Sequence, residues 1–232
     1  MKIYLTLLAG LFHLFIFGQT FKVKKYLEKQ GLQNRFVSAI EQDDLGFLWI
    51  GTGDGIYRFD GFEFINAAPY LEEVSVTTSY RSSANDIWFG LGDGRLFRVQ
   101  NQQVDAIDYG ASQPSKINQI IVSATGTLYI LSQDQGIFSI DTNGQKKHYH
   151  SGLEEFTLYC LYPLTEDQLL VGTDMGLIHV HLSNDGSCTY DWNDSIIETK
   201  VSCIHHLDGT LIIGTDDQGI YSYGLTDGSI QN

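Results

Sequence analysis

The sequence predicts an all-β protein, a β-propeller built from four-stranded blades, and three observations support this prediction. One pattern recurs five times: an apolar strand, a polar turn, an apolar triplet, a short turn ending in glycine, and a second apolar strand. The glycines that end the short turns are Gly55, Gly94, Gly136, Gly176 and Gly219, spaced 39, 42, 40 and 43 residues apart. No repeat shows helical periodicity beyond a turn or two. A period of roughly 40 residues that contains only strands is typical of a propeller blade.

Turn residues divide each repeat into four strands, named a to d from the propeller axis outward. In the first repeat, the Asp54-Gly55 and Asp60-Gly61 pairs supply the positive-φ positions that tight hairpins need. Its four strands are expected at about 37–42, 47–51, 56–60 and 62–66. The five blades are expected at about 36–69, 74–109, 117–150, 156–192 and 199–232.

Two recurring positions in strand b indicate how the blades pack. A glycine such as Gly51 follows the apolar triplet in four of the five repeats, and a residue without Cβ lets neighbouring sheets approach closely. Leu131 replaces it in the third repeat, so that blade is expected to pack slightly differently. Trp49, Trp88 and Tyr129 share another position, and we interpret them as packing between blades rather than as a platform for a ligand.

The closure of the ring has two alternatives at this stage. The segment 20–30 precedes the first strand a and alternates well enough to form a strand. It could replace a short or missing strand d of the fifth blade, which would close a five-bladed ring and protect its edges. Alternatively, the chain is the first part of a longer propeller of about six to eight blades.

The N-terminus differs from the rest of the chain. Lys2 precedes an apolar run over 3–17, and Gly18 follows it, which is typical of a signal peptide over residues 1–19. The run is shorter than the roughly 20 residues that span a bilayer, although an uncleaved anchor remains an alternative. A periplasmic or secreted protein is expected.

Composition excludes some partners. The formal net charge is −14 at pH 7, and such a surface repels nucleic acid and anionic membranes. The three cysteines show no metal-binding spacing, and their odd number prevents complete pairing within the chain. Because Cys160 and Cys203 occupy equivalent repeat positions, we interpret them as small buried residues.

Residues with catalytic or metal-binding chemistry are present only as weak signals. No GxSxG, HExxH or P-loop motif occurs, so no catalytic, cofactor-binding or metal-binding residue is assigned. Histidines are paired at 148 and 150, at 179 and 181, and at 205 and 206, but a zinc site needs three or four converging ligands. One aspartate per repeat stands at or beside the b–c turn, and all b–c turns open on the same propeller face. These residues, Asp54, Asp93, Asp134, Asp174 and Asp216, could form an acidic ring that attracts a cation, an amine or a basic partner, or could simply serve their turns.

The first repeat, residues 31–61, resembles the two-component-regulator propeller repeat. It matches that family's V-x-x-I-x-x-D pattern at 37–43, its x-G-x-L-W-I-G-T pattern at 45–52 and its G-(I/L)-x-R-(Y/F)-D-G pattern at 55–61. The other repeats match less closely, and the third matches least. The resemblance implies the exported sensor region of Bacteroidetes-type hybrid histidine kinases and related regulators, in many of which the propellers recognise glycan fragments or other nutrients.

The function expected from this resemblance is an extracytoplasmic ligand-sensing module of a two-component-type receptor. The kinase, immunoglobulin-like and membrane regions of such receptors are not in this sequence, so it is expected to be a truncated product, a fragment or a free-standing propeller. A membrane would then be reached only through a receptor region that is not in this sequence, or through an uncleaved anchor. The expected partner is a small molecule or glycan. The alternatives are a protein-interaction scaffold without a small ligand, and a propeller lyase or glycosidase.

Overall fold

Five four-stranded antiparallel sheets make up the protein in the computed structural model, which describes residues 23–26, 28–71, 73–113, 115–192 and 197–232. The predicted signal peptide lies outside the described residues. The first sheet contains β1 (Val37–Gln42), β2 (Leu48–Thr52), β3 (Gly55–Phe59) and β4 (Phe64–Asn66). The second contains β5 (Val76–Arg81), β6 (Ile87–Leu91), β7 (Leu96–Gln100) and β8 (Gln103–Ile107).

The remaining sheets repeat the same order of strands. The third contains β9 (Ile117–Val122), β10 (Leu128–Ser132), β11 (Gly136–Ile140) and β12 (Lys146–Tyr149). The fourth contains β13 (Leu158–Pro163), β14 (Gln168–Thr173), β15 (Leu177–Leu182) and β16 (Cys188–Trp192). The fifth contains β17 (Val201–Leu207), β18 (Thr210–Thr215), β19 (Ile220–Gly224) and β20 (Ile230–Gln231).

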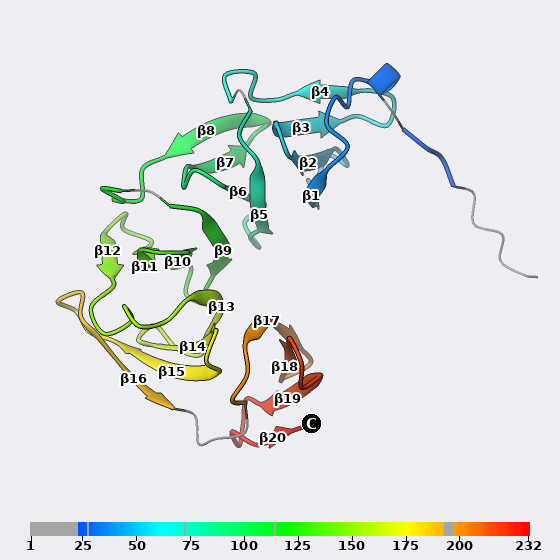
Figure 1. Cartoon of the computed structure of the whole chain (residues 1–232). Coiled ribbons are helices and arrows are strands. Elements are labelled where there is room, and N and C mark those ends of the chain that lie inside the picture. Colours follow the sequence, from blue (N-terminus) through cyan, green and yellow to red (C-terminus); the bar gives the residue numbers. More distant parts are fainter. Residues whose placement is uncertain (1–22, 27, 72, 114, 193–196) are drawn as a thin grey trace, which may run out of the picture.

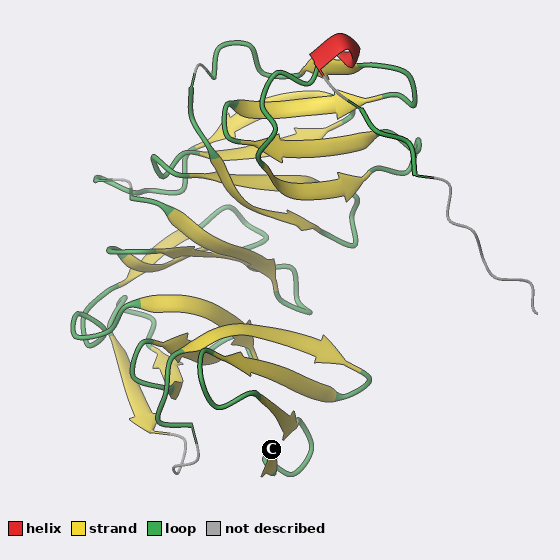
Figure 2. Cartoon of the chain, turned by 45° about the vertical axis from the view of Figure 1, so that its right-hand side comes forward, coloured by secondary structure: helices red, strands yellow, loops and turns green. Residues whose placement is uncertain are grey.

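The sheets are arranged around a common centre as propeller blades, which confirms the predicted fold class. The first strand of each sheet is innermost and the fourth is outermost (Figure 1). Each innermost strand contacts the next one along the chain, from β1 through β5, β9 and β13 to β17. The five blades form an arc, and no comparably extensive contact joins β17 to β1 among the described residues. Figure 2, turned by 45°, shows the strands as successive layers.

The core lies between neighbouring blades, because each sheet covers the apolar face of the next. Every residue of β6 and of β10 is buried. Trp49 of the first blade packs in one cluster with Val76 and Phe89 of the second. Trp49 and Tyr129 are each only 1% exposed, and Trp88 is 8% exposed, which confirms that their shared repeat position serves packing.

The recurring glycine of strand b marks the closest approach between blades. A Cβ atom on Gly51 would lie 2.5 Å from Val76 Cγ1, and one on Gly90 would lie 2.6 Å from Ile117 Cγ2. Val76 and Ile117 are the first residues of strand a in the following blade. The short distances therefore confirm the prediction that a residue without Cβ allows neighbouring sheets to approach closely. In the third blade the buried side chain of Leu131 takes this place and packs in one cluster with Leu158 and Leu161.

Polar side chains also link neighbouring blades at the second residue of strand a. This residue lies in an irregular part of the strand register, beside the glycine of strand b in the first two blades and beside Leu131 in the third. It donates to the backbone carbonyl of the residue that begins the next blade. The pairs are Ser38 with Val76 (2.7 Å), Thr77 with Ile117 (2.6 Å) and Asn118 with Leu158 (2.8 Å).

The alternative in which residues 20–30 form the outer strand of the fifth blade is wrong for the part of this segment that the structure describes. Glu28–Gln30 is a 3₁₀ helix, and residues 23–26 are not a strand. The ring of Tyr26 packs edge-on against Phe59 and Phe64, with centroids 4.9 and 5.8 Å away, so the segment covers the first blade. In the fifth blade, β20 already pairs with β19.

Candidate ligand-binding site

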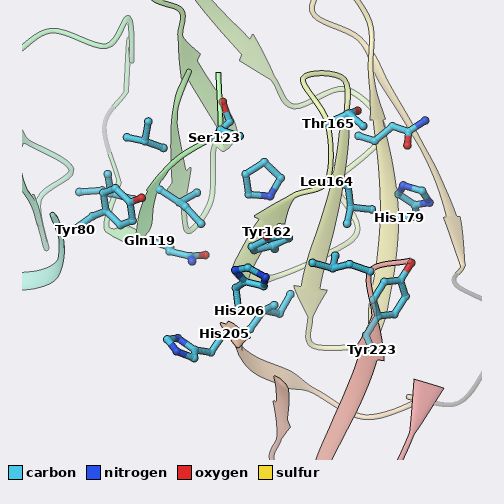
Figure 3. A pocket seen from close by; sticks show the side chains of 18 of the residues that line it. Tyr80, Gln119, Ser123, Tyr162, Leu164, Thr165, His179, His205, His206 and Tyr223 are labelled. Atoms are coloured by element: carbon cyan, nitrogen blue, oxygen red, sulfur yellow. The ribbon is translucent and has the colours of Figure 1, made fainter. Parts of the chain in front are cut away.

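A cavity of about 950 Å³ opens at the end of the propeller that carries the a–b turns. It is formed by the last residues of β5, β9, β13 and β17 and by the turns that follow β9 and β13, with further side chains from β15 and β19. Figure 3 shows the side chains around a common space, with Tyr80 and Gln119 on one side and His179 and Tyr223 on the other. Four blades therefore contribute to a single site.

The aromatic lining is provided by three tyrosines and the histidines. Tyr162 lies 5.7 Å from the His206 ring, centroid to centroid, with the two planes tilted by 42°. Burial raises the pKa of Tyr162, and the nearby Tyr80 adds to this shift. The hydroxyls of Tyr80, Tyr162 and Tyr223 have no hydrogen bond to other described residues. They are therefore available to a bound molecule as donors and acceptors.

The amide of Gln119 is held in one orientation. Its Oε1 accepts a hydrogen bond from the backbone N–H of Leu161, 2.5 Å away in the next blade. Because the oxygen is used in this way, the NH₂ group of Gln119 is the part of the amide left to donate into the cavity.

The imidazoles differ in their surroundings. His206 Nε2 accepts the backbone N–H of Gly209 at 3.3 Å. His179 Nε2 is buried and has no hydrogen-bond partner among the described residues. Burial, and then the neighbouring His181 imidazole, lower the pKa of His179, while the Asp191 carboxylate opposes this shift. His179 is thus a neutral group whose buried nitrogen lacks a partner.

The carboxylates bound to the cavity's serines lie outside its lining. Glu41 accepts the hydroxyl of Ser79 at 2.7 Å, and Glu166 accepts that of Ser123 at 2.9 Å. Of the 19 described residues that line the cavity, none is Asp, Glu, Lys or Arg. The lining therefore combines aromatic rings, amides, hydroxyls and imidazoles without a permanent charge.

The five aspartates proposed as an acidic ring lie at the opposite end of the blades, because a–b and b–c turns alternate along an antiparallel sheet. Most of their carboxylates bind groups of their own blade. Asp54 accepts the hydroxyls of Thr52 and Tyr57, Asp93 pairs with Arg95, Asp174 accepts the Thr157 N–H, and Asp216 pairs with Lys200. The Asp134 N–H donates to Ser115. These contacts stabilise the turns, and binding of a cation or partner by the acidic ring stays a prediction.

The structure also places the histidine pairs and the cysteines that the sequence analysis considered. The rings of His148 and His150 stack with centroids 5.9 Å apart, and no group of three potential metal ligands exists among the described residues. Cys160 is buried as expected, but the interpretation of Cys203 as buried is wrong. The fifth sheet packs against the fourth and covers Cys160. Among the described residues, no further sheet packs against the fifth to cover Cys203.

Sequence reasoning named His179, His205 and His206 but missed the tyrosines and Gln119. One signal could have found part of the site. The fifth residue of strand a lies in the cavity in four blades, as Tyr80, Ile121, Tyr162 and His205. This position changes its chemistry from blade to blade, whereas the packing positions keep theirs.

Comparison with known proteins agrees with this fold. Residues 31–54 match the family described as two component regulator propeller. A 47-residue segment is 43% identical to histidine kinase P4 of Formosa agariphila and covers 20% of this chain and 3% of that protein.

Solved structures share the propeller fold at lower identity. The extracellular domain of the hybrid two-component system BT3049 from B. thetaiotaomicron superposes with a TM-score of 0.63 at 22% identity, over 90% of this chain and 31% of that domain. Virginiamycin B lyase from Staphylococcus aureus gives a TM-score of 0.66 at 15% identity, over 86% of this chain and 70% of that protein. The chain thus spans about a third of the BT3049 domain and a small part of the kinase. None of the described helices is long and apolar enough to cross a membrane.

Proposed function

We propose that this two-component regulator propeller is an extracytoplasmic ligand-sensing module, and that it binds its ligand in the cavity at the a–b end. The observation that carries the proposal is the convergence of side chains from four blades on a single cavity of about 950 Å³. Ligand sites in proteins are usually concave and largely apolar, with a few polar groups that fix orientation. The lining described above has this composition.

The family match and the structural neighbours support a sensing role rather than a purely structural one. The matched repeat and the neighbour from a hybrid two-component system both belong to signalling proteins. Because the cavity is built by several blades, a bound ligand contacts β5, β9, β13 and β17 at once. Binding energy can therefore shift the angle between blades, which is the kind of rearrangement that a receptor can transmit.

The lyase alternative makes a different prediction for the same cavity. The virginiamycin B lyase neighbour shows that the fold can host an enzyme, at an identity that establishes the fold alone. In a sensor, a bound ligand is recovered unchanged, whereas an enzyme releases a product. Chromatography of the ligand after incubation separates the two functions.

The test is calorimetric titration of the full chain with a library of glycan fragments and other small nutrients. Tyr162→Ala removes one aromatic wall of the cavity, and we expect it to weaken binding at least about tenfold. Phe62→Ala is the matched control, since Phe62 is an aromatic residue with 84% exposure outside the cavity. Equal affinity of both variants and the parent protein, with unchanged unfolding midpoints, would show that the ligand binds elsewhere.

A further inference from the structure

We infer that the fifth blade is a movable wall of the cavity, which pivots about the contact between β13 and β17 while the first four blades move as one body. The inference rests on the proposed function and deepens it, because it names the junction at which a bound ligand would change the shape of the propeller. The contacts that cross the four junctions between successive blades carry this inference.

Directional polar contacts fasten the first three junctions. Each has a hydrogen bond from the second residue of strand a to the next blade. Arg81 pairs with Asp44 at 2.5 Å across the first junction, and Lys146 pairs with Asp108 at 2.7 Å across the second. At the third junction, the carboxylate of Glu166 accepts two hydroxyls of the preceding blade, at 2.9 and 2.8 Å. Because hydrogen bonds require a narrow range of geometry, these contacts hold the angle between the joined blades.

The fourth junction lacks the link from the second residue of strand a. Tyr159 stands at this position, and its side chain has no hydrogen bond to any described residue of the fifth blade. The polar contacts that it and its neighbour make here are weak: Cys160 Sγ lies 3.8 Å from the carbonyl oxygen of Val201, and Lys200 Nζ lies 4.5 Å from the centre of the Tyr159 ring. An apolar cluster holds the two blades together. Apolar burial is non-directional, so it stabilises this contact without fixing its angle.

The fifth blade is also held from one side only in the described part of the chain. Ile220 is 64% exposed, whereas Ile56, at the same position opposite the strand-b glycine, is 0% exposed and packs in one cluster with Val76 of the following blade. The first blade likewise has one neighbouring blade, but Tyr26 and its segment cover its other face. The fifth blade is therefore the least restrained of the five by the described residues.

The cavity lies across this fourth junction. The fourth blade contributes Tyr162 and His179, among others, and Tyr162 approaches His206 of the fifth blade with ring centroids 5.7 Å apart (Figure 3). A ligand that touches both blades binds best at one angle between them, so it selects that angle from the range that the fifth blade samples. Closure of this kind is a hinge motion of two rigid bodies. The fifth blade contributes five lining residues to the cavity: Ile204, His205, His206, Tyr223 and Leu225.

The experiment measures the distance between two nitroxide labels by pulsed electron paramagnetic resonance, with no ligand added. One label is attached at Gln103→Cys, exposed on β8 in the second blade, and the other at Thr226→Cys, exposed in the turn after β19. In the matched control pair, Ser183→Cys in the corresponding turn of the fourth blade replaces Thr226→Cys. Both chains carry Cys203→Ser, so that the exposed native thiol is not labelled. We expect the distance distribution to be at least about twice as broad for the pair that reaches the fifth blade.

The variant Tyr159→Thr tests whether the missing link causes this freedom. The Thr77 hydroxyl donates to the carbonyl of Ile117 at 2.6 Å, and we expect a threonine at 159 to donate to the Val201 carbonyl in the same way. Tyr159→Val is the matched control, because it has the same shape without the hydroxyl and both variants lose the contact with Lys200. We expect Tyr159→Thr to narrow the distribution to within about 1.5-fold of the control pair, and Tyr159→Val to leave it broad.

The outcomes separate this inference from the proposed function. Equal widths for the two label pairs in the chain with Tyr159 intact would overturn the inference, whether or not the Tyr159 variants fold. Equal widths for Tyr159→Thr and Tyr159→Val, once urea denaturation shows that both are folded, would also overturn it. Neither result affects the sensor proposal, which the titrations with Tyr162→Ala decide. Conversely, a mobile fifth blade in a protein that binds no ligand in the cavity would sustain the hinge and overturn the sensor proposal.

Discussion

Cys160 and Cys203 occupy the same position of strand a in neighbouring blades, but their environments differ. Cys160 lies against the carbonyl of Val201 in the following blade, and its sulfur is 3.8 Å from that oxygen. Burial raises the pKa of the Cys160 thiol to about 12, and the nearby Cys203 adds to the shift. Burial likewise raises the pKa of Cys188 to about 11, with a further contribution from Glu154. Because the thiolate is the reactive form, both residues should be inert in the folded protein.

This difference predicts a single fast-reacting thiol. At pH 8, an aromatic disulfide reagent should modify Cys203 at least about tenfold faster than the other two cysteines, since Cys203 is exposed. The fast phase should disappear in Cys203→Ser and persist in Cys160→Ser. All three thiols should react together after unfolding in urea. Rapid modification of Cys160 in the folded protein would show that the contact between β13 and β17 opens readily.

Among the structural elements, the contact between successive strands a depends on the glycine of strand b. A Cβ on Gly172 would lie 2.5 Å from Cys160 Sγ in its own blade and 2.6 Å from Val201 Cγ1 in the next. A Cβ on Gly214 would lie 2.7 Å from Cys203 Sγ in its own blade, with no described atom of a following blade within 4 Å. The two glycines thus differ mainly in the contact between blades.

Alanine substitutions at these glycines form a matched pair. Gly172→Ala should lower the free energy of unfolding by about 1–3 kcal/mol more than Gly214→Ala, because overpacking forces two blades apart. Urea denaturation followed by tryptophan fluorescence measures both values. The change in intrinsic strand preference is the same in both variants and cancels in the comparison. Similar losses would mean that the own-blade cysteine, rather than the neighbouring blade, requires the glycine.

The repeat pattern explains why the blades were predictable and the site was only partly so. Positions such as Gly51 and Trp49 recur because every blade must pack on the next, and recurrence is visible in one sequence. Tyr80, Gln119 and Tyr162 lie at repeat positions whose residue type varies among the five blades. Only the arrangement of the blades in space brings these side chains together. Cys203 was misjudged for a related reason, because its exposure depends on what covers the fifth sheet rather than on its own repeat.

In the whole molecule, the cavity and the five aspartates of the proposed acidic ring lie at opposite ends of the blades. The a–b end carries the uncharged cavity, and the b–c end carries the five aspartates. Coulomb interactions across the blades are weakened by distance and by salt, whose screening length is about 8 Å at physiological ionic strength. Binding at one end should therefore be nearly independent of charge at the other.

Replacing Asp54, Asp93, Asp134, Asp174 and Asp216 together by Asn tests both ends at once. If the carboxylates act jointly, the variant should bind a divalent cation or a basic peptide at least about tenfold more weakly than the parent, because five negative charges are removed. The affinity for a neutral ligand in the cavity should change less than about twofold. Calorimetry measures each interaction, after urea denaturation has established that the variant is folded. Unchanged binding of the cation and the peptide would reduce the aspartates to turn-forming residues, whereas a large change in neutral-ligand affinity would contradict the separation of the two ends.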